Sequence, residues 1–78
     1  MVVIVYSTPT CRFCTAVKRY LKDHKIRFRE VDVSRDARSA AEMTRKTGQQ
    51  GVPVIDVNGR IIVGFDKQRL NAALGIKG

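Results

Sequence analysis

Two cysteines, Cys11 and Cys14, are the residues of this sequence whose type and spacing point most directly to chemistry. They enclose Arg12 and Phe13, and the resulting C-x-x-C follows an apolar, β-branched segment, a setting typical of a dithiol redox motif. Residues three apart lie on one face of a helix, where two sulfur atoms can bond with little movement of the backbone. The spacing therefore predicts two thiols that are reversibly oxidised to a disulfide.

The expected position of the pair, at the start of a helix, favours the reactive thiolate. Unpaired N–H groups and the positive end of the helix dipole stabilise negative charge there, and the guanidinium of Arg12 acts in the same direction. Such surroundings lower the pKa of a thiol. We expect Cys11, at the very end of the helix, to be the exposed nucleophile and Cys14, one turn further in, to be the more buried resolving thiol.

Three other interpretations of the pair stay open at this point. Both thiols could be inert core residues, or they could form a static structural disulfide, although cytosolic thiols are kept reduced. The pair could also be half of a zinc or iron–sulfur site shared between chains, which would make the protein a cluster-binding dimer. Two cysteines are too few for a four-thiolate site or a disulfide framework within one chain, so we expect no metal there.

Hydrophobic periodicity and turn signals place the elements around the motif. Strands are expected over 1–6, 26–33, 53–57 and 60–63, and helices over about 12–25, 35–47 and 67–74. The imperfect alternation of 26–33 indicates a bulge or an edge strand. Ser34 and Asp66 are the expected N-caps, Gly48 and Gly75 the expected helix ends, and Asn58-Gly59 predicts a tight hairpin.

The resulting order is β-α-β-α-β-β-α, which places the chain in the α/β class. A first βαβ unit implies two parallel strands, and the Asn58-Gly59 hairpin adds antiparallel pairing. We therefore expect a mixed sheet of about four strands with three helices packed on its faces.

Length and charge limit the classes of protein that this chain can be. Its 78 residues allow a single domain over residues 1–78, and the longest apolar run, Met1–Tyr6, is far shorter than the ~20 residues that span a bilayer. The net charge is 15 − 7 = +8, but the basic residues are scattered and form no five-residue block. We expect a cytoplasmic monomer with a solvated basic surface that attracts acidic partners, and neither nucleic-acid nor membrane binding.

Three segments together resemble the glutaredoxins of the thioredoxin superfamily. Residues 6–14 are similar to the active-site entry of that family, and residues 47–55 to the segment that leads into its cis-proline. Gly64-Phe65-Asp66 lies where the family carries a glycine-containing turn before the last helix. The similarity covers essentially the whole chain in the same element order, which implies the thioredoxin fold and a thiol–disulfide oxidoreductase with a redox-active centre.

The resemblance also implies roles for individual residues. Pro53 would be cis and would place the turn that it forms with Val52 against Cys11, and the backbone of Val52 would pair with a substrate peptide or with glutathione. The turn formed by Gly64, Phe65 and Asp66 would lie beside the same substrate. Arg12 would attract acidic partners, and the rings of Phe13 and Phe65 would give the site an apolar rim unless they belong to the core.

The sequence departs from glutathione-using glutaredoxins at several positions. Those proteins usually enclose Pro-Tyr between the cysteines, often carry Lys at the position of Thr8, commonly carry Thr at that of Gly51, and usually have Gly-Gly where this chain has Gly64-Phe65. The Gly-Phe pair is more similar to the NrdH-redoxins, which take electrons from thioredoxin reductase.

The chemistry that follows is the reduction of protein disulfides by the cysteine pair, in a role of electron transport and cell redox homeostasis. The exchange itself needs no bound cofactor. The resemblance implies that the electron source would be thioredoxin reductase with NADPH or, alternatively, glutathione, in which case the substrates would be glutathione mixed disulfides.

Overall fold

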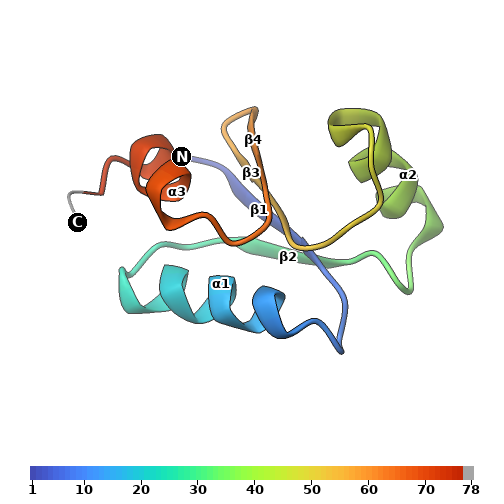
Figure 1. Ribbon diagram of the computed structural model, residues 1–78, viewed down its shortest axis with the longest axis horizontal. Helices are drawn as coiled ribbons and strands as arrows, with labels where there is room; N and C mark the ends of the chain where they lie inside the picture. The colour runs from blue at the N-terminus through green and yellow to red at the C-terminus, as the bar shows by residue number, and fades with distance from the viewer. Residues whose placement is uncertain (77–78) are drawn as a thin grey trace.

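The computed structural model describes residues 1–76, which form four strands and three helices in the predicted order (Figure 1). The elements are β1 (Val3–Ser7), α1 (Arg12–Asp23), β2 (Arg29–Asp32), α2 (Ala37–Thr47), β3 (Val54–Val57), β4 (Arg60–Val63) and α3 (Lys67–Leu74).

The strands form one mixed sheet in the order β2-β1-β3-β4, which confirms the predicted architecture. Strand β1 pairs in parallel with β2 and antiparallel with β3, and β3 pairs antiparallel with β4. The hairpin between β3 and β4 turns at Asn58 and Gly59, whose φ angles are 51° and 92°, as a turn with two left-handed residues requires. Strand β2 lies at an edge of the sheet, one of the two explanations for its irregular alternation.

Helices α1 and α3 cover one face of the sheet and α2 covers the other (Figure 1). Because successive side chains of a strand point to opposite faces, Val5 packs toward α1 and α3 while its neighbour Tyr6 packs toward α2. The first face is closed by Val17 and Leu21 of α1, together with residues of α3. Because its alternate side chains pack against helices on both faces of the sheet, β1 is held between two layers of helix.

Two expected boundaries were wrong around β2. The strand begins only at Arg29, although Ile26 and Phe28 before it still pack against the core. Helix α2 is capped by Asp36, whose side chain accepts from the N–H groups of Arg38 and Ser39, and Ser34 is not its N-cap.

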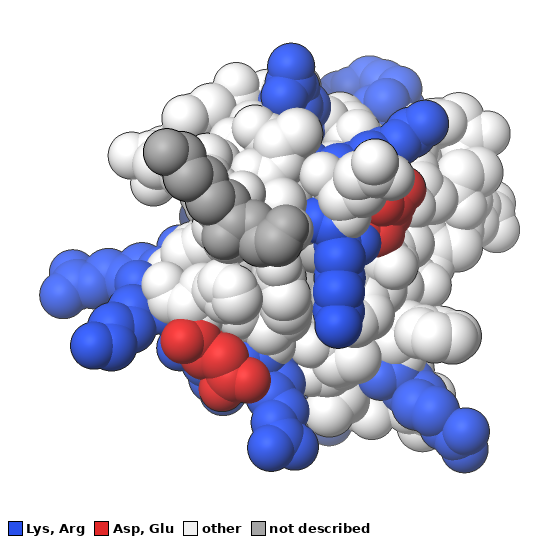
Figure 2. Space-filling model, turned by 60° about the vertical axis from the view of Figure 1, so that its left-hand side comes forward, with Lys and Arg blue, Asp and Glu red and all other residues white. Residues whose placement is uncertain are grey.

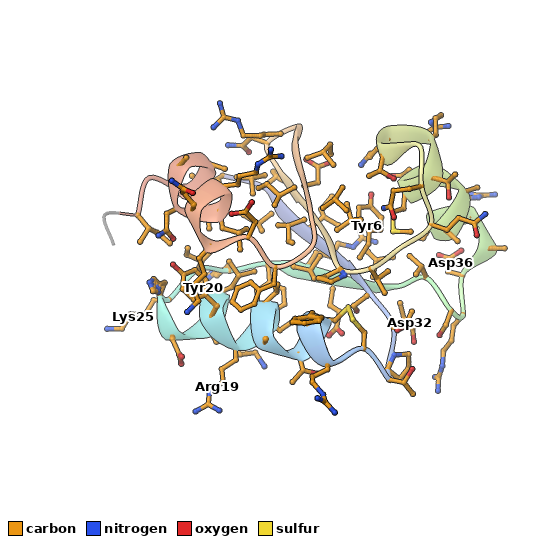
Figure 3. The ribbon with its side chains drawn as sticks, in the orientation of Figure 1. Tyr6, Arg19, Tyr20, Lys25, Asp32 and Asp36 are labelled. Atoms are coloured by element: carbon orange, nitrogen blue, oxygen red, sulfur yellow. A yellow bond between two sulfur atoms is a disulfide. The ribbon has the colours of Figure 1, made fainter. Side chains whose placement is uncertain are left out.

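The reason lies in the connection between β2 and α2, where Asp32 and Asp36 are labelled in Figure 3. The Asp32 carboxylate accepts hydrogen bonds from both the backbone and the hydroxyl of Ser34. This local turn removes Ser34 from the capping role. Three other predicted helix ends hold: Asp66 caps α3 by accepting from Arg69 N–H, and Gly48 and Gly75 end α2 and α3 in the left-handed conformation. Helix α1 ends at Asp23, two residues before its expected end.

A polar network joins β1, α2 and β3 on the face that α2 covers. The Lys46 ammonium donates to the Tyr6 hydroxyl at 2.8 Å and to Asp56 Oδ2 at 2.9 Å, and it lies 3.1 Å from Glu42 Oε1. Tyr6 donates to Glu42 in turn. These bonds hold the pKa of Lys46 well above its ordinary value, the bond to Tyr6 being the strongest cause.

Replacing Lys46 with methionine is expected to lower the free energy of unfolding by about 2 kcal/mol, because it leaves the nearly buried Asp56 carboxylate without its cation. Urea denaturation of the variant at neutral pH measures the change. The control is Arg45→Met on the exposed side of the same helix, for which we expect little change. Equal losses in the two variants would show that the network does not stabilise the fold.

The basic side chains stand at several places around the face drawn in Figure 2, with uncharged surface and a few acidic side chains among them. This agrees with the scattered charges of the sequence. Within residues 1–76, the helices are too short and too polar to cross a membrane.

Candidate active site

The three segments that resemble the glutaredoxins meet at one end of the sheet. In the antiparallel register between β1 and β3, Tyr6 lies opposite Val54. Pro53, which directly precedes Val54, therefore lies at the end of β1 that leads into the cysteine loop. Val54 also lies opposite Val63 of β4, which places Gly64 beside Pro53. The N–H of Gly64 donates to the Pro53 carbonyl at 2.8 Å. The sheet therefore brings together segments that lie far apart in the sequence.

Cys11 and Cys14 are joined as a disulfide at the beginning of α1, with their Cα atoms 5.2 Å apart. Cys11 is the N-cap residue, and its sulfur accepts from the Cys14 N–H at 3.1 Å. Cys11 is partly exposed, whereas Cys14 is fully buried. The pair thus has one sulfur near the surface and one beneath it, as the sequence predicted.

The charges around Cys11 favour an anion at its sulfur. The first turn of α1 contains no acidic residue, and the exposed Arg12 follows Cys11 directly. The N–H groups of this turn point toward the cap position, where a thiolate is stabilised by the helix dipole. The N–H of Cys11 itself donates to the Thr8 carbonyl at 3.3 Å, which fixes the loop that presents the sulfur.

The two phenylalanines of the predicted apolar rim differ in their surroundings. Phe13 is 62% exposed, so it is not part of the core. Phe65 packs edge-on against Tyr20 of α1, with ring centroids 5.7 Å apart, and lies at the border of the core. In Figure 3 Tyr20 lies on α1, on the side toward α3. Phe13 is therefore the ring that offers apolar surface beside the cysteines.

The segment before β3 has the expected cis peptide bond between Val52 and Pro53. Pro53 is buried and Val52 is partly exposed. The Gln49 side chain bridges the loop just before them, since its amide accepts from Gly51 N–H at 2.5 Å and donates to the Gly51 carbonyl at 3.0 Å. A Cβ atom at Gly51 would lie 2.6 Å from Gln49 Oε1, so a larger residue here would displace the Gln49 side chain from this bridge.

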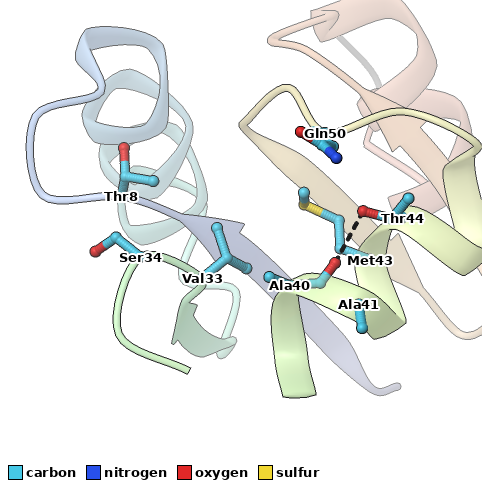
Figure 4. A pocket seen from close by; sticks show the side chains of 8 residues that line it. All are labelled: Thr8, Val33, Ser34, Ala40, Ala41, Met43, Thr44 and Gln50. Carbon is cyan, nitrogen blue, oxygen red and sulfur yellow. Dashed lines mark hydrogen bonds between the residues drawn. The ribbon is translucent and has the colours of Figure 1, made fainter. Parts of the chain in front are cut away.

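A groove of about 500 Å³, which the sequence did not reveal, opens between this segment, the cysteine loop and α2 (Figure 4). We call it the neutral groove, because none of its lining residues is charged. It is lined by Thr8, Val33, Ser34, Ala40, Ala41, Met43, Thr44 and Gln50. Four separate segments contribute to it, so no local pattern in the sequence indicates it.

A second group that sequence reasoning missed joins β1, α1 and β2. Glu30 Oε2 accepts from the buried Ser7 hydroxyl at 3.0 Å and from the Lys18 ammonium at 2.6 Å. The bond from Lys18 is the main cause that lowers the pKa of Glu30 below its ordinary value of 4.5. A polar Ser7 at the end of an apolar strand is the signal that points to this group. The group ties β2 to the end of β1 from which the cysteine loop starts.

Glu30 is expected to make stability depend on pH. Because its pKa is lower in the folded than in the unfolded chain, its contribution is fully present above the unfolded value and is lost as the pH falls through the folded value. We expect Glu30→Gln to be less stable than the unchanged protein at pH 7, and the difference to shrink below about pH 4. Urea denaturation of both proteins, at pH 7 and at a pH below about 4, measures the difference in their free energies of unfolding. A difference that stays constant across this range would contradict the assignment.

Comparison with known proteins decides the family. The glutaredoxin family model matches residues 3–62, which is most of the chain. The chain belongs to the glutaredoxin family. It is 46% identical over 67 residues to an uncharacterized glutaredoxin-like 8.6 kDa protein of the rubredoxin operon of Clostridium pasteurianum, covering 86% of this chain and 89% of that one.

Solved structures of thioredoxin-like and glutaredoxin-like proteins share the fold. A variant of the thioredoxin-like protein BC3987 superposes with a TM-score of 0.90 at 28% identity, covering 96% of both chains. NrdH-redoxin from Escherichia coli superposes with a TM-score of 0.82 at 26% identity, covering 92% of this chain and 93% of its own. The thioredoxin fold predicted from the sequence is therefore confirmed.

Family, fold and cysteine pair agree on the class of activity: this glutaredoxin is a thiol–disulfide oxidoreductase. Within residues 1–76, the histidine, cysteine and acidic side chains form no cluster of three or more that would hold a metal ion.

Proposed function

We propose that the protein reduces disulfides in other proteins, with Cys11 as the nucleophile and Cys14 as the resolving thiol. The observation that carries this proposal is the asymmetry of the pair: Cys11 caps α1 and is partly exposed, whereas Cys14 is fully buried. A bulky protein disulfide can reach only the first sulfur, and that sulfur occupies the position that favours a thiolate.

The exchange proceeds in two steps that transfer two electrons. The Cys11 thiolate attacks one sulfur of the substrate disulfide, forms a mixed disulfide and releases the other substrate sulfur as a thiolate. Cys14, as a thiolate, then attacks Cys11 Sγ, which forms the Cys11–Cys14 disulfide and releases the second substrate thiolate. The released thiolates take up protons from solvent according to their pKa values, and a two-electron reductant restores the dithiol.

The residues around the pair are proposed to hold the substrate rather than to react. The Val52 backbone, presented by Pro53, would pair with the extended substrate, while Phe13 offers an apolar contact and Arg12 a positive charge. The turn of Gly64, Phe65 and Asp66 would border the same surface, because Gly64 is bonded to Pro53. We further propose that the protein acts as a cytoplasmic monomer in electron transport.

We infer that the reductant is a thioredoxin reductase with NADPH rather than glutathione. Three departures from the glutathione-using glutaredoxins support this inference. Thr8 stands where those proteins often carry lysine, and Gly51, where they commonly carry threonine, is bonded to the Gln49 side chain. Gly64 is followed by Phe65, where they usually have a second glycine. NrdH-redoxin, which has a similar fold, is described as a glutaredoxin-like protein with a thioredoxin-like activity profile.

Parallel coupled assays test the electron source. The oxidised protein is mixed with NADPH and a bacterial thioredoxin reductase, or with NADPH, glutathione and glutathione reductase, and NADPH oxidation is followed with a peptide disulfide as substrate. We expect turnover at least about tenfold faster with thioredoxin reductase. Faster turnover with glutathione would overturn the assignment of the reductant but not that of the two cysteines.

A further inference from the structure

The neutral groove begins at the loop that carries Cys11. Thr8 forms one of its walls, and the Thr8 carbonyl accepts from the Cys11 N–H at 3.3 Å. Gln50 forms another wall and precedes the Val52–Pro53 bond by two residues. Figure 4 shows α2 along one side of the groove and Thr8 across from it. A polypeptide whose disulfide reaches Cys11 therefore has its neighbouring residues within reach of this groove.

The chemistry of the lining excludes most charged occupants. All eight lining residues are uncharged in a chain whose net charge is +8. Val33 and the two alanines of α2 offer apolar surface, and Met43 lines the groove although it is almost completely buried. The Thr44 hydroxyl already donates to the Ala40 carbonyl at 3.0 Å. A charged side chain placed here would lose hydration and gain no counter-charge, whereas an apolar one would bury surface on both sides.

We propose that the neutral groove selects the substrate by taking an uncharged, apolar side chain next to the disulfide of the polypeptide being reduced. The inference rests on the proposed function, because Cys11 must be the sulfur that the substrate approaches. The neutral groove has a volume of about 500 Å³, which lies in the range of pockets that hold small ligands, roughly 300–1,000 Å³. The groove then favours apolar sequences, while the charge of the whole molecule favours acidic ones, so the two effects can be separated.

A series of cystine peptides separates them. The peptides are identical except for one residue beside the disulfide, which is Leu, Ser, Glu or Lys, and kcat/KM is measured with the reduced protein under a common reductant. We expect kcat/KM of the Leu peptide to exceed that of both the Glu and the Lys peptide by about tenfold. The value for the Ser peptide should lie between that of the Leu peptide and those of the two charged peptides. A ranking with Glu first would show that overall charge governs selection and would overturn the proposal.

One variant and its matched control place the selectivity in the groove. Ala41→Lys adds a positive charge to the groove rim, and we expect it to reverse the order of the Leu and Glu peptides. Ala72→Lys adds the same charge on the exposed surface of α3, outside the groove, and is expected to leave the order unchanged. Circular dichroism establishes that both variants are folded.

The failures of the two proposals are distinguishable. Equal rates for all four peptides, or the same preferences in Ala41→Lys and the unchanged protein, would overturn the role of the groove while leaving the cysteine chemistry intact. Failure of the unchanged protein to reduce any peptide would instead overturn the proposed function on which the inference rests.

Discussion

Cys11→Ser is expected to abolish the reduction of disulfides, with a loss of at least about a thousandfold in turnover. A serine hydroxyl at the helix cap is not ionised near neutral pH, so the group that attacks the substrate sulfur is lost. Cys14 does not replace it, because its side chain is fully buried behind the first turn of α1. Turnover of a peptide disulfide under a common reductant measures the effect.

The cap position makes Cys11→Ser a well-controlled change. Serine is itself a favourable N-cap, and its oxygen can accept from the Cys14 N–H as the Cys11 sulfur does. We therefore expect thermal unfolding of the reduced variant to match that of the reduced, unchanged protein. Full activity in this variant would show that the nucleophile is wrongly assigned.

Cys14→Ser is expected to stop the cycle after its first step. Cys11 still attacks the substrate, but the mixed disulfide that forms has no neighbouring thiol to resolve it. Turnover of protein disulfides should fall by about a hundredfold or more, because attack by a free thiol replaces an intramolecular step. Gel electrophoresis without reductant should show the substrate attached to the protein.

Added glutathione or dithiothreitol provides the control for Cys14→Ser. An external thiol should release the attached substrate and restore part of the turnover, in proportion to its concentration. A variant that turns over protein disulfides at the unchanged rate, without added thiol, would contradict the resolving role of Cys14.

The sequence predicted the order of the elements because each carries a local signal. Asn58-Gly59 marks the hairpin, Asp66 and Gly75 bound the last helix, and the pattern of Val17 and Leu21 marks the buried stripe of α1. Each of these signals depends on residues close together in the chain. They suffice to place the cysteine pair after a strand and at the beginning of a helix.

Other features depended on contacts that local patterns do not contain. Ser34 and Asp36 are both suitable N-caps of α2. Asp36 is the N-cap because the Asp32 carboxylate accepts hydrogen bonds from the backbone and hydroxyl of Ser34. The helical spacing of Phe13 from Val17 allowed a core position, but the buried stripe of α1 runs through Cys14, and Phe13 stays exposed beside it.

The neutral groove could not be predicted from the sequence. It exists because the register of the sheet brings the loop of Thr8 near the segment of Gln50, with α2 and the end of β2 closing its sides. Neutral residues such as Ala40 and Thr44 carry no motif, and their shared lack of charge has meaning only once the walls are assembled. The cysteine pair was predictable from the sequence, whereas the surface that is proposed to choose its substrate was not.

Mass spectrometry of the trapped intermediate tests the central claim most directly. Reduced Cys14→Ser is mixed with a peptide disulfide, quenched with acid and digested, and the attached peptide is located. The account predicts one peptide per chain, joined through a disulfide to Cys11, and no such adduct in Cys11→Ser under the same conditions. An adduct that forms equally on Cys14 in Cys11→Ser, or no adduct on Cys11 in Cys14→Ser, would contradict it.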